Sequence, residues 1–122
     1  MIEHILRGHI AAGYFARQLA TLPYGTVFPV EGAEALHGVH GSIAHPEGLH
    51  TRPTTQFVKR AKELGIDRAY VVAGDKYGHT GSILSLLPLG VRQGEHVTLV
   101  ADHGEEPNKL VELYRVLTGT IQ

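Results

Sequence analysis

The segment "HPEGLHTRPTTQFVKRAKELG", residues 45–65, marks the point where a loop becomes a helix. From residue 51 to residue 64 the apolar side chains recur at helical spacing, and Gly65 is a typical residue to end such a helix. Pro53 suits the first helical turn, where its missing N–H costs nothing. The spacing therefore predicts an amphipathic helix over 51–64 that begins next to His50. Its apolar face consists of Thr54, Phe57, Val58, Ala61 and Leu64.

The residues around His50 have the chemistry of a phosphate site. At a helix N-terminus the N–H groups of Thr51 and Arg52 have no partner within the helix, and such groups bind anions. The Arg52 guanidinium can form paired hydrogen bonds with a phosphate, and Gly48 lets the loop approach closely or adopt a positive φ. Histidine is available in its neutral form near pH 7. The pattern indicates an imidazole that attacks phosphorus, although a plain helix cap explains a single histidine here equally simply.

On both sides of this helix, strand patterns alternate with helix patterns. The sequence predicts strands within 38–45, over 67–73 and over 95–102, with a short and less regular one near 76–79. A short helix is expected from Ser82 to Gly90, and a longer one follows Pro107. With the first helix this gives the order β-α-β-(β)-α-β-α, which is typical of an α+β sandwich whose helices cover one face of an antiparallel sheet.

Three motifs resemble one known family. "GLHTRP", "FVKRAKELG" and "GHTGSILSLLPLGVRQGEHVTLVADHGEE" occur in the order and spacing of HPr, the histidine-containing phosphocarrier of the bacterial sugar phosphotransferase system. The resemblance covers about residues 36–118. It implies an HPr-like open-faced β-sandwich of class α+β, with four antiparallel strands and three helices on one face, to which an N-terminal helix is added here.

The resemblance also implies a function and its residues. His50 would accept a phosphoryl group on Nδ1 from phosphorylated enzyme I and pass it to sugar-specific IIA domains. Arg52, Gly48 and the amides of Thr51 and Arg52 would hold the phosphate. The protein would be a stoichiometric phosphohistidine carrier rather than a true enzyme, and it would need no cofactor.

A second group of residues would bind the partner proteins. In the family, part of the helix after Ser82 forms an exposed apolar patch beside the active histidine. Ser82 itself matches a position that a regulatory kinase phosphorylates in some members, while its simpler interpretation is a helix N-cap. Ile83 and Leu84 are expected to be partly exposed. The predicted partner-binding residues are Ile83, Leu84, Leu87, Gln56 and Lys59.

Glu47 departs from the family pattern, which commonly has Asn or Ser at this position. An ionised carboxylate close to a phosphohistidine would repel the phosphoryl group. We therefore expect Glu47 either to point to solvent or to shorten the life of the phosphohistidine and speed onward transfer.

Residues 1–35 lie outside the resemblance. Residues 1–22 show helical spacing with a stripe of small apolar residues, and "PYGTVFPVEGAEALHG" reads as a linker or extended arm. The predicted division is an extension over 1–35 and a phosphocarrier domain over 36–122. The extension is a remnant or linker of a larger multidomain protein, a helix packed on the open face of the sheet, or a dimerisation element.

Composition narrows the remaining classes. The chain has 122 residues, 43% of them apolar, which suits one domain with a packed core. A net charge of −1 gives no basic surface for nucleic acid. The sequence contains no cysteine, no long apolar run and no signal-peptide pattern, so a cytoplasmic protein without membrane insertion is expected.

Three rival interpretations of the sequence are a metal site, a partner-binding module and a hydrolase. Nine histidines suggest a metal site, but His37 and His40 on one strand would face opposite ways, and no metal site is predicted. An HPr-like regulatory or partner-binding module that acts by protein contact would not need both His50 and Arg52. A hydrolase built on His50 with Glu47 or Asp102 lacks any nucleophile motif.

Overall fold

The computed structural model describes residues 2–17 and 21–119. Its centre is one antiparallel sheet whose strands lie in the order β1-β2-β5-β3-β4. Central β5 pairs with β2 on one side and with β3 on the other, and β4 returns along β3. The strands are β1 (Phe28–Pro29), β2 (Leu36–Ser42), β3 (Ala69–Ala73), β4 (Lys76–His79) and β5 (His96–Asp102).

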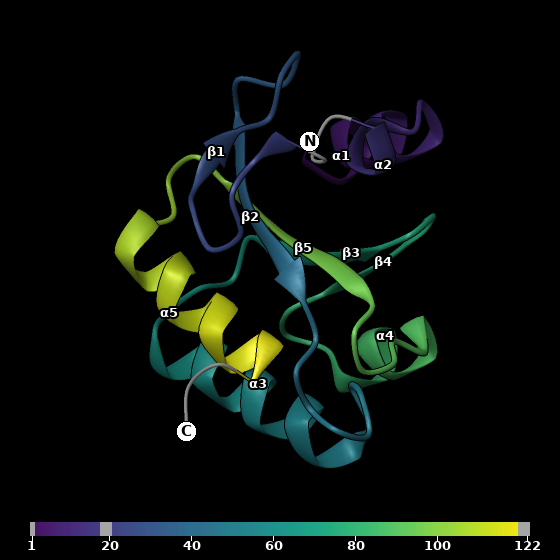
Figure 1. The fold of residues 1–122 in the computed structure, drawn as a ribbon. Helices are drawn as coiled ribbons and strands as arrows, with labels where there is room; N and C mark the ends of the chain where they lie inside the picture. Colours follow the sequence, from purple (N-terminus) through teal and green to yellow (C-terminus); the bar gives the residue numbers. More distant parts are fainter. Residues whose placement is uncertain (1, 18–20, 120–122) are drawn as a thin grey trace.

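The predicted open-faced sandwich is confirmed. Three helices lie on one side of the sheet, and α3 and α5 run side by side beneath it (Figure 1). The short strand near residue 76 is present, and the helix after His50 spans almost the predicted range. These helices are α3 (Thr51–Glu63), α4 (Ile83–Leu86) and α5 (Pro107–Thr118), with a 3-10 turn, η2 (Leu87–Leu89), after α4.

The core under these helices is aliphatic. Alternate residues of the central strand, Val97 and Leu99, point into it because side chains on a strand alternate between faces. Phe57 of α3 and Leu113 of α5 meet them from below, and both are at most 1% exposed. We call this side the helix-covered face; it provides the rigid base on which the loop before α3 rests.

The other face of the sheet is covered by the N-terminal extension. Helices α1 (Ile2–Ala11) and α2 (Tyr14–Arg17) lie on the opposite side from α3 and α5 (Figure 1). Leu6 of α1 packs in one cluster with Val72 of β3 and Val100 of β5. The expectation that the extension packs on the open face is thereby confirmed. We call this side the extension-covered face.

Two details of the extension differ from the sequence prediction. Residues 1–22 do not form one helix: the helix ends at Ala11, and Gly13 has a φ of 75°, which an L side chain rarely adopts. Residues 18–20, within the predicted helix, lie outside the described residues. The segment after Pro23 is more than a linker, because β1 pairs with β2 and adds a fifth strand at the edge of the sheet.

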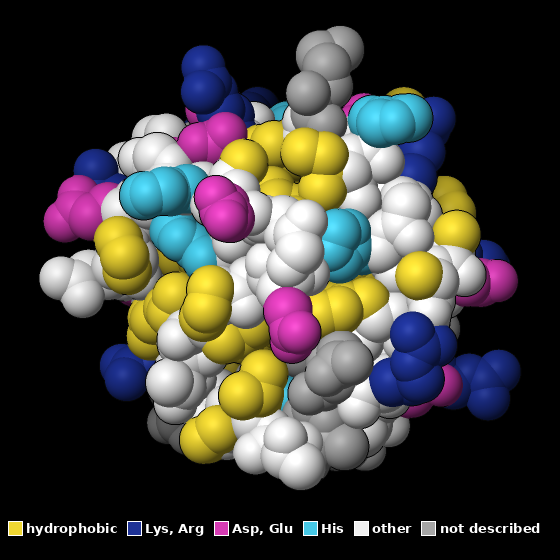
Figure 2. Space-filling view, turned by 90° about the horizontal axis from the view of Figure 1, so that it is seen from above, with side chains coloured by type: hydrophobic (Ala, Val, Ile, Leu, Met, Phe, Trp, Pro, Cys, Tyr) yellow, Lys and Arg dark blue, Asp and Glu magenta, His cyan; other side chains and the backbone are white. Residues whose placement is uncertain are grey.

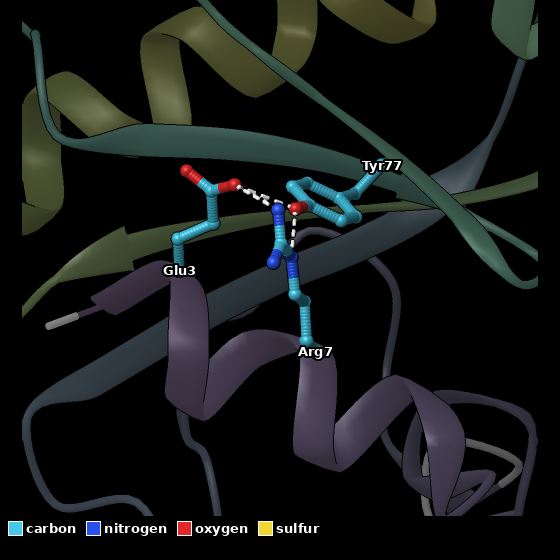
Figure 3. Close-up of polar contacts among 3 residues, drawn as sticks. All are labelled: Glu3, Arg7 and Tyr77. Atoms are coloured by element: carbon cyan, nitrogen blue, oxygen red, sulfur yellow. Dashed lines mark hydrogen bonds and ion pairs between the residues drawn. The ribbon is translucent and has the colours of Figure 1, made fainter.

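A polar cluster joins α1 to the far edge of the sheet. The Tyr77 hydroxyl on β4 donates to Glu3 at 2.7 Å and accepts from Arg7 Nε, while Arg7 also binds Glu3 at 2.8 Å (Figure 3). The hydrogen bond from Tyr77 and the charge of Arg7 lower the pKa of Glu3. The three groups satisfy one another's hydrogen bonds. These polar contacts therefore hold α1 against β4, in addition to the apolar packing of α1 on the sheet.

The outer surface of the extension side is mixed in character. Figure 2 looks onto this side and shows apolar side chains in patches between histidines and charged side chains. Among the residues that the structure describes, no helix has the length and apolar character needed to cross a membrane.

Candidate functional site

His50 is the residue immediately before α3. Its backbone is extended (φ −85°, ψ −171°), and its carbonyl accepts the first helical hydrogen bond, from the Thr54 N–H at 3.1 Å. Its side chain makes no capping hydrogen bond, and 43% of that side chain is exposed. The simple helix-cap interpretation of His50 therefore does not describe its side chain, which remains accessible to a partner.

The start of α3 presents the predicted anion donors. Thr51 and Arg52 are the first two helical residues, and both are exposed. Their N–H groups lie in the turn where a helix offers no internal acceptor, and the described residues provide none from elsewhere. Pro53 is buried in the same turn, where it fixes the backbone and has no N–H. The N-terminus of α3, the exposed residue Arg52 and the His50 imidazole thus lie at one exposed corner of the molecule.

Gly48 fits the loop before His50 closely against the segment between η2 and β5. Its φ is 74°, and a Cβ atom at this position would lie 2.2 Å from the Val91 carbonyl oxygen. The adjacent Leu49 N–H donates to that same carbonyl at 2.9 Å, and the buried Leu49 side chain joins the helix-covered core. Gly48 therefore serves the site by letting the loop seat tightly, which places His50 two residues later.

The Glu47 carboxylate is exposed to solvent and also lies close to His50. Its Oε2 atom lies 3.6 Å from Nε2 of His50, within ion-pair range but longer than a hydrogen bond. Its own side chain is 80% exposed. The structure thus places a solvent-exposed carboxylate beside the histidine, and its expected effect on the life of the phosphohistidine stays a prediction.

An apolar patch lies on α4 and η2. Leu84 is 84% exposed, and Ile83 and Leu87 are half-buried, so the predicted exposure of Ile83 and Leu84 is confirmed. Helix α4 packs beside α3, whose residues Gln56 and Lys59 are exposed. The five predicted partner-binding residues therefore lie on α3, on α4 and on the η2 turn that follows α4, and their role in binding stays a prediction.

Ser82 caps α4. Its backbone is extended, and its Oγ accepts from the Ser85 N–H at 3.2 Å. This geometry accounts for the serine without any regulatory phosphate.

The histidines do not assemble into a metal site. Within residues 2–17 and 21–119, no group of three or more His, Asp or Glu side chains is arranged to hold a metal ion. His40 joins the extension-covered face, where its Nε2 bonds the Leu22 carbonyl and its Nδ1 lies 2.8 Å from Nε2 of His96. His37, three residues away on β2, carries a buried Nε2 without a partner among the described residues.

One part of the site was missed by reasoning from sequence. The loop that carries His50 is seated by the backbone of Val91 and Arg92, which lies more than forty residues along the chain. No local sequence pattern indicates this contact. The only signal was the glycine at position 48, whose close approach was expected but whose partner was not.

The comparisons with known proteins agree with this geometry. A family model described as the PTS HPr component phosphorylation site matches residues 41–118. The phosphocarrier protein HPr of Haemophilus influenzae is 39% identical over 80 residues, which cover 66% of this chain and 92% of that protein. The crystal structure of HPr-C-His from Thermoanaerobacter tengcongensis matches with a TM-score of 0.56 and 31% identity, over 69% of this chain and 89% of that one.

A longer relative contains a similar segment. A multiphosphoryl transfer protein of Xanthomonas campestris pv. campestris is 38% identical over 76 residues, which cover 62% of this chain but only 9% of that protein. The family-model match includes the three helices of the sandwich and the corner that carries His50. Fold and corner together define a phosphocarrier of the phosphotransferase system. The chain belongs to the HPr family.

Proposed function

We propose that this protein accepts a phosphoryl group on His50 from phosphorylated enzyme I and passes it to sugar-specific IIA domains. The observation that carries the proposal is the accessible His50 imidazole at the N-terminus of α3, beside the unpartnered N–H groups of Thr51 and Arg52. Transfer between proteins requires such exposure. Phosphoryl transfer depends mainly on positioning and charge stabilisation, and both are available at this corner.

Each residue has a distinct part in the proposed relay. The imidazole Nδ1 forms the bond to phosphorus, and the two amides and the Arg52 guanidinium hold the phosphoryl oxygens. Gly48 seats the loop. Leu84, with Ile83 and Leu87, forms the apolar surface that a partner covers, since an exposed apolar cluster is a recognised mark of an interface.

The surroundings of the site suit a carrier that meets other proteins. No nucleic acid contact, membrane insertion or cofactor is part of the proposal. We place the relay in the cytoplasm, which agrees with a chain that lacks cysteine. Residues 1–35 are proposed as a unit added to a phosphocarrier domain over 36–122.

The direct test is the intact mass after incubation with enzyme I, magnesium and phosphoenolpyruvate. One acid-labile phosphate is expected in the wild type and none in His50→Ala. His103→Ala is the matched control, since His103 is also an exposed histidine, and it should still accept phosphate. Labelling of His50→Ala would show that the site is wrong.

Arg52→Ala tests the phosphate cradle separately. Because Arg52 is exposed, the variant should fold normally but exchange phosphate with enzyme I more slowly. Unchanged rates would remove Arg52 from the site. A folded wild type that accepts no phosphate would instead favour an HPr-like module that acts through protein contact alone.

A further inference from the structure

The carboxylate of Glu47 faces a particular nitrogen of the imidazole. The ion-pair contact joins Glu47 Oε2 to Nε2 of His50, at 3.6 Å. Nε2 is the nitrogen that the proposed function leaves without phosphate. A carboxylate on that side can hold a proton there, so its effect on the histidine includes more than repulsion of a phosphoryl group.

We propose that Glu47 is a positioning residue that keeps a proton on Nε2 of His50 throughout phosphoryl transfer. This inference rests on the proposed function, because it concerns the same histidine. In a neutral imidazole one nitrogen carries the proton and the other carries the lone pair. With its proton held on Nε2, His50 presents the Nδ1 lone pair to phosphorus.

The proton on Nε2 is needed in both directions of transfer. When His50 is phosphorylated, the Nδ1 lone pair forms the P–N bond while the donor leaves with the electrons of its own bond to phosphorus. The ring keeps its Nε2 proton and becomes a positively charged phosphoimidazolium. In onward transfer a lone pair of the acceptor forms the new bond to phosphorus, while the electrons of the P–Nδ1 bond return to the ring, which departs as neutral imidazole. A ring without that proton would have to depart as an imidazolate anion, which is a far poorer leaving group.

Carboxylates support histidine in this way elsewhere. In the Ser-His-Asp triad the aspartate fixes the tautomer and stabilises the imidazolium that forms, without becoming protonated itself. The contact here is longer than a hydrogen bond, and catalytic contacts of this type often tighten only when the partner binds. Since the Glu47 side chain is mostly exposed, the effect should be that of a solvated ion pair rather than a buried one.

The other charged groups at this corner cannot replace Glu47. Arg52 lies in the first turn of α3, and the Cα of Arg92 lies 2.8 Å from the position of a Cβ on Gly48. Both residues are cations and accept no proton. In the described part of the chain, Glu47 is the only acidic side chain within 4.0 Å of the His50 ring nitrogens.

Proton holding and simple repulsion predict different pH profiles. Repulsion between the carboxylate and the phosphoryl group shortens the life of the phosphohistidine at every pH at which Glu47 is ionised. Proton holding instead extends the pH range in which the ring is a good leaving group. The two effects separate at alkaline pH, where the ring loses its proton.

The experiment compares the wild type with Glu47→Gln and with Glu34→Gln, an exposed glutamate of the extension that matches the change in net charge. Each protein is phosphorylated with phosphoramidate, and the loss of phosphate to water is followed by intact mass from about pH 6 to about pH 10. The alkaline fall in rate should occur at a lower pH in Glu47→Gln than in the wild type, because the carboxylate that holds the proton is gone. Glu34→Gln should match the wild type.

A second measurement identifies which nitrogen of His50 carries the phosphate and which carries the proton. Long-range proton–nitrogen spectra of the phosphorylated proteins should show phosphate on Nδ1 and an Nε2 proton that persists to higher pH in the wild type than in Glu47→Gln. Identical profiles, or a uniform change in rate without displacement along the pH axis, would overturn the role of Glu47 and leave the proposed function intact. A wild type that takes no phosphate on His50 from phosphoramidate or enzyme I would overturn both.

Discussion

The two faces of the sheet are covered by different means. On the helix-covered face, long amphipathic helices supply mostly aliphatic side chains, such as Leu110 and Leu113 of α5. On the extension-covered face, helix α2 and strand β1 supply aromatic side chains: Tyr14, Phe15 and Phe28. Polar contacts from Glu3, Arg7 and Tyr77 then hold the edge, as Figure 3 shows.

The two faces of the sheet also differ in their relation to the family match. The family match begins at residue 41 and covers the helices, the central strands and the corner with His50. The extension lies before that match and packs on the opposite face of the sheet from α3 (Figure 1). The extension thus forms a second layer on the side of the sheet away from the helix that carries the site. The two faces should respond differently to mutation.

The largest effects are expected from shortening a buried leucine side chain in either of the two cores. Leu113 and Leu6 are both 0% exposed, and replacing such a leucine by alanine costs about 2–5 kcal/mol. Leu113→Ala should lower the free energy of unfolding of the whole domain. Leu6→Ala should mainly loosen the extension, while α3 keeps its hydrogen-exchange protection and His50 still accepts phosphate. Denaturant unfolding and amide exchange, measured on both variants, check this.

The same response in both variants would contradict this separation of the two faces. If Leu6→Ala reduces the protection of α3 as much as Leu113→Ala does, the two cores unfold as one cooperative unit. The extension would then be an integral part of the fold rather than an added layer.

The next effect concerns the loop that the helix-covered face supports. Gly48→Ala should cost about 2 kcal/mol or more, because the new Cβ meets the Val91 carbonyl at 2.2 Å in addition to the strain of a positive φ. Phosphate acceptance should fall with it, since the loop cannot seat His50. Thermal unfolding and intact mass with enzyme I provide the two measurements.

Gly65→Ala is the matched control for Gly48→Ala. Gly65 has almost the same φ, 72°, but a Cβ there meets nothing within 4 Å. It should cost only the backbone strain, about 1 kcal/mol, and leave phosphate acceptance unchanged. Equal losses in both variants would mean that the close approach at Gly48 contributes nothing to the site.

The difference between local patterns and contacts distant in sequence explains what the sequence could predict. The helix at 51–63 and the strand at 96–102 were predictable because their periodicity is local and strong. The position of His50 followed from the motif around it. The clash partner of Gly48 was not predictable, because Val91 is distant in sequence. Strand β1 was missed because a two-residue strand has too few positions to show alternation, and its pairing with β2 depends on the tertiary fold.

A smaller effect is expected at the edge of the extension-covered face. Tyr77→Phe removes a hydroxyl that donates to Glu3 and accepts from Arg7, so it should cost about 1 kcal/mol. The control is Tyr24→Phe, where the hydroxyl has no hydrogen bond among the described residues and the ring, which packs edge-on to His40, is kept. Urea unfolding should separate the two variants. Equal stabilities would reduce the polar cluster to a surface contact.

The smallest effect is a loss of stability in mild acid that arises on the extension-covered face. Partial burial and the neighbouring His40 ring hold the pKa of His96 below its ordinary value of about 6.5. The unfolded chain therefore binds the proton more readily than the folded one. The stabilisation is complete above pH 6.5 or so and declines as the pH falls below it, by less than about 1 kcal/mol for a partly exposed ring.

The His96 ring is hydrogen-bonded to the neighbouring His40 ring. Because the Leu22 carbonyl can only accept, His40 Nε2 donates to it, and His40 Nδ1 accepts a hydrogen bond from Nε2–H of His96 at 2.8 Å. His96→Gln keeps a donor for His40 but removes the titration, so its stability should fall less than that of the wild type between pH 7.5 and pH 5, values that bracket the ordinary pKa of about 6.5. His4→Gln, which changes an exposed histidine of α1, should retain the wild-type fall. If His96→Gln loses as much stability in acid as the wild type, the sensitivity belongs to another group, and the half-buried His37 on the helix-covered face, whose pKa is also lowered by burial, is the next to test.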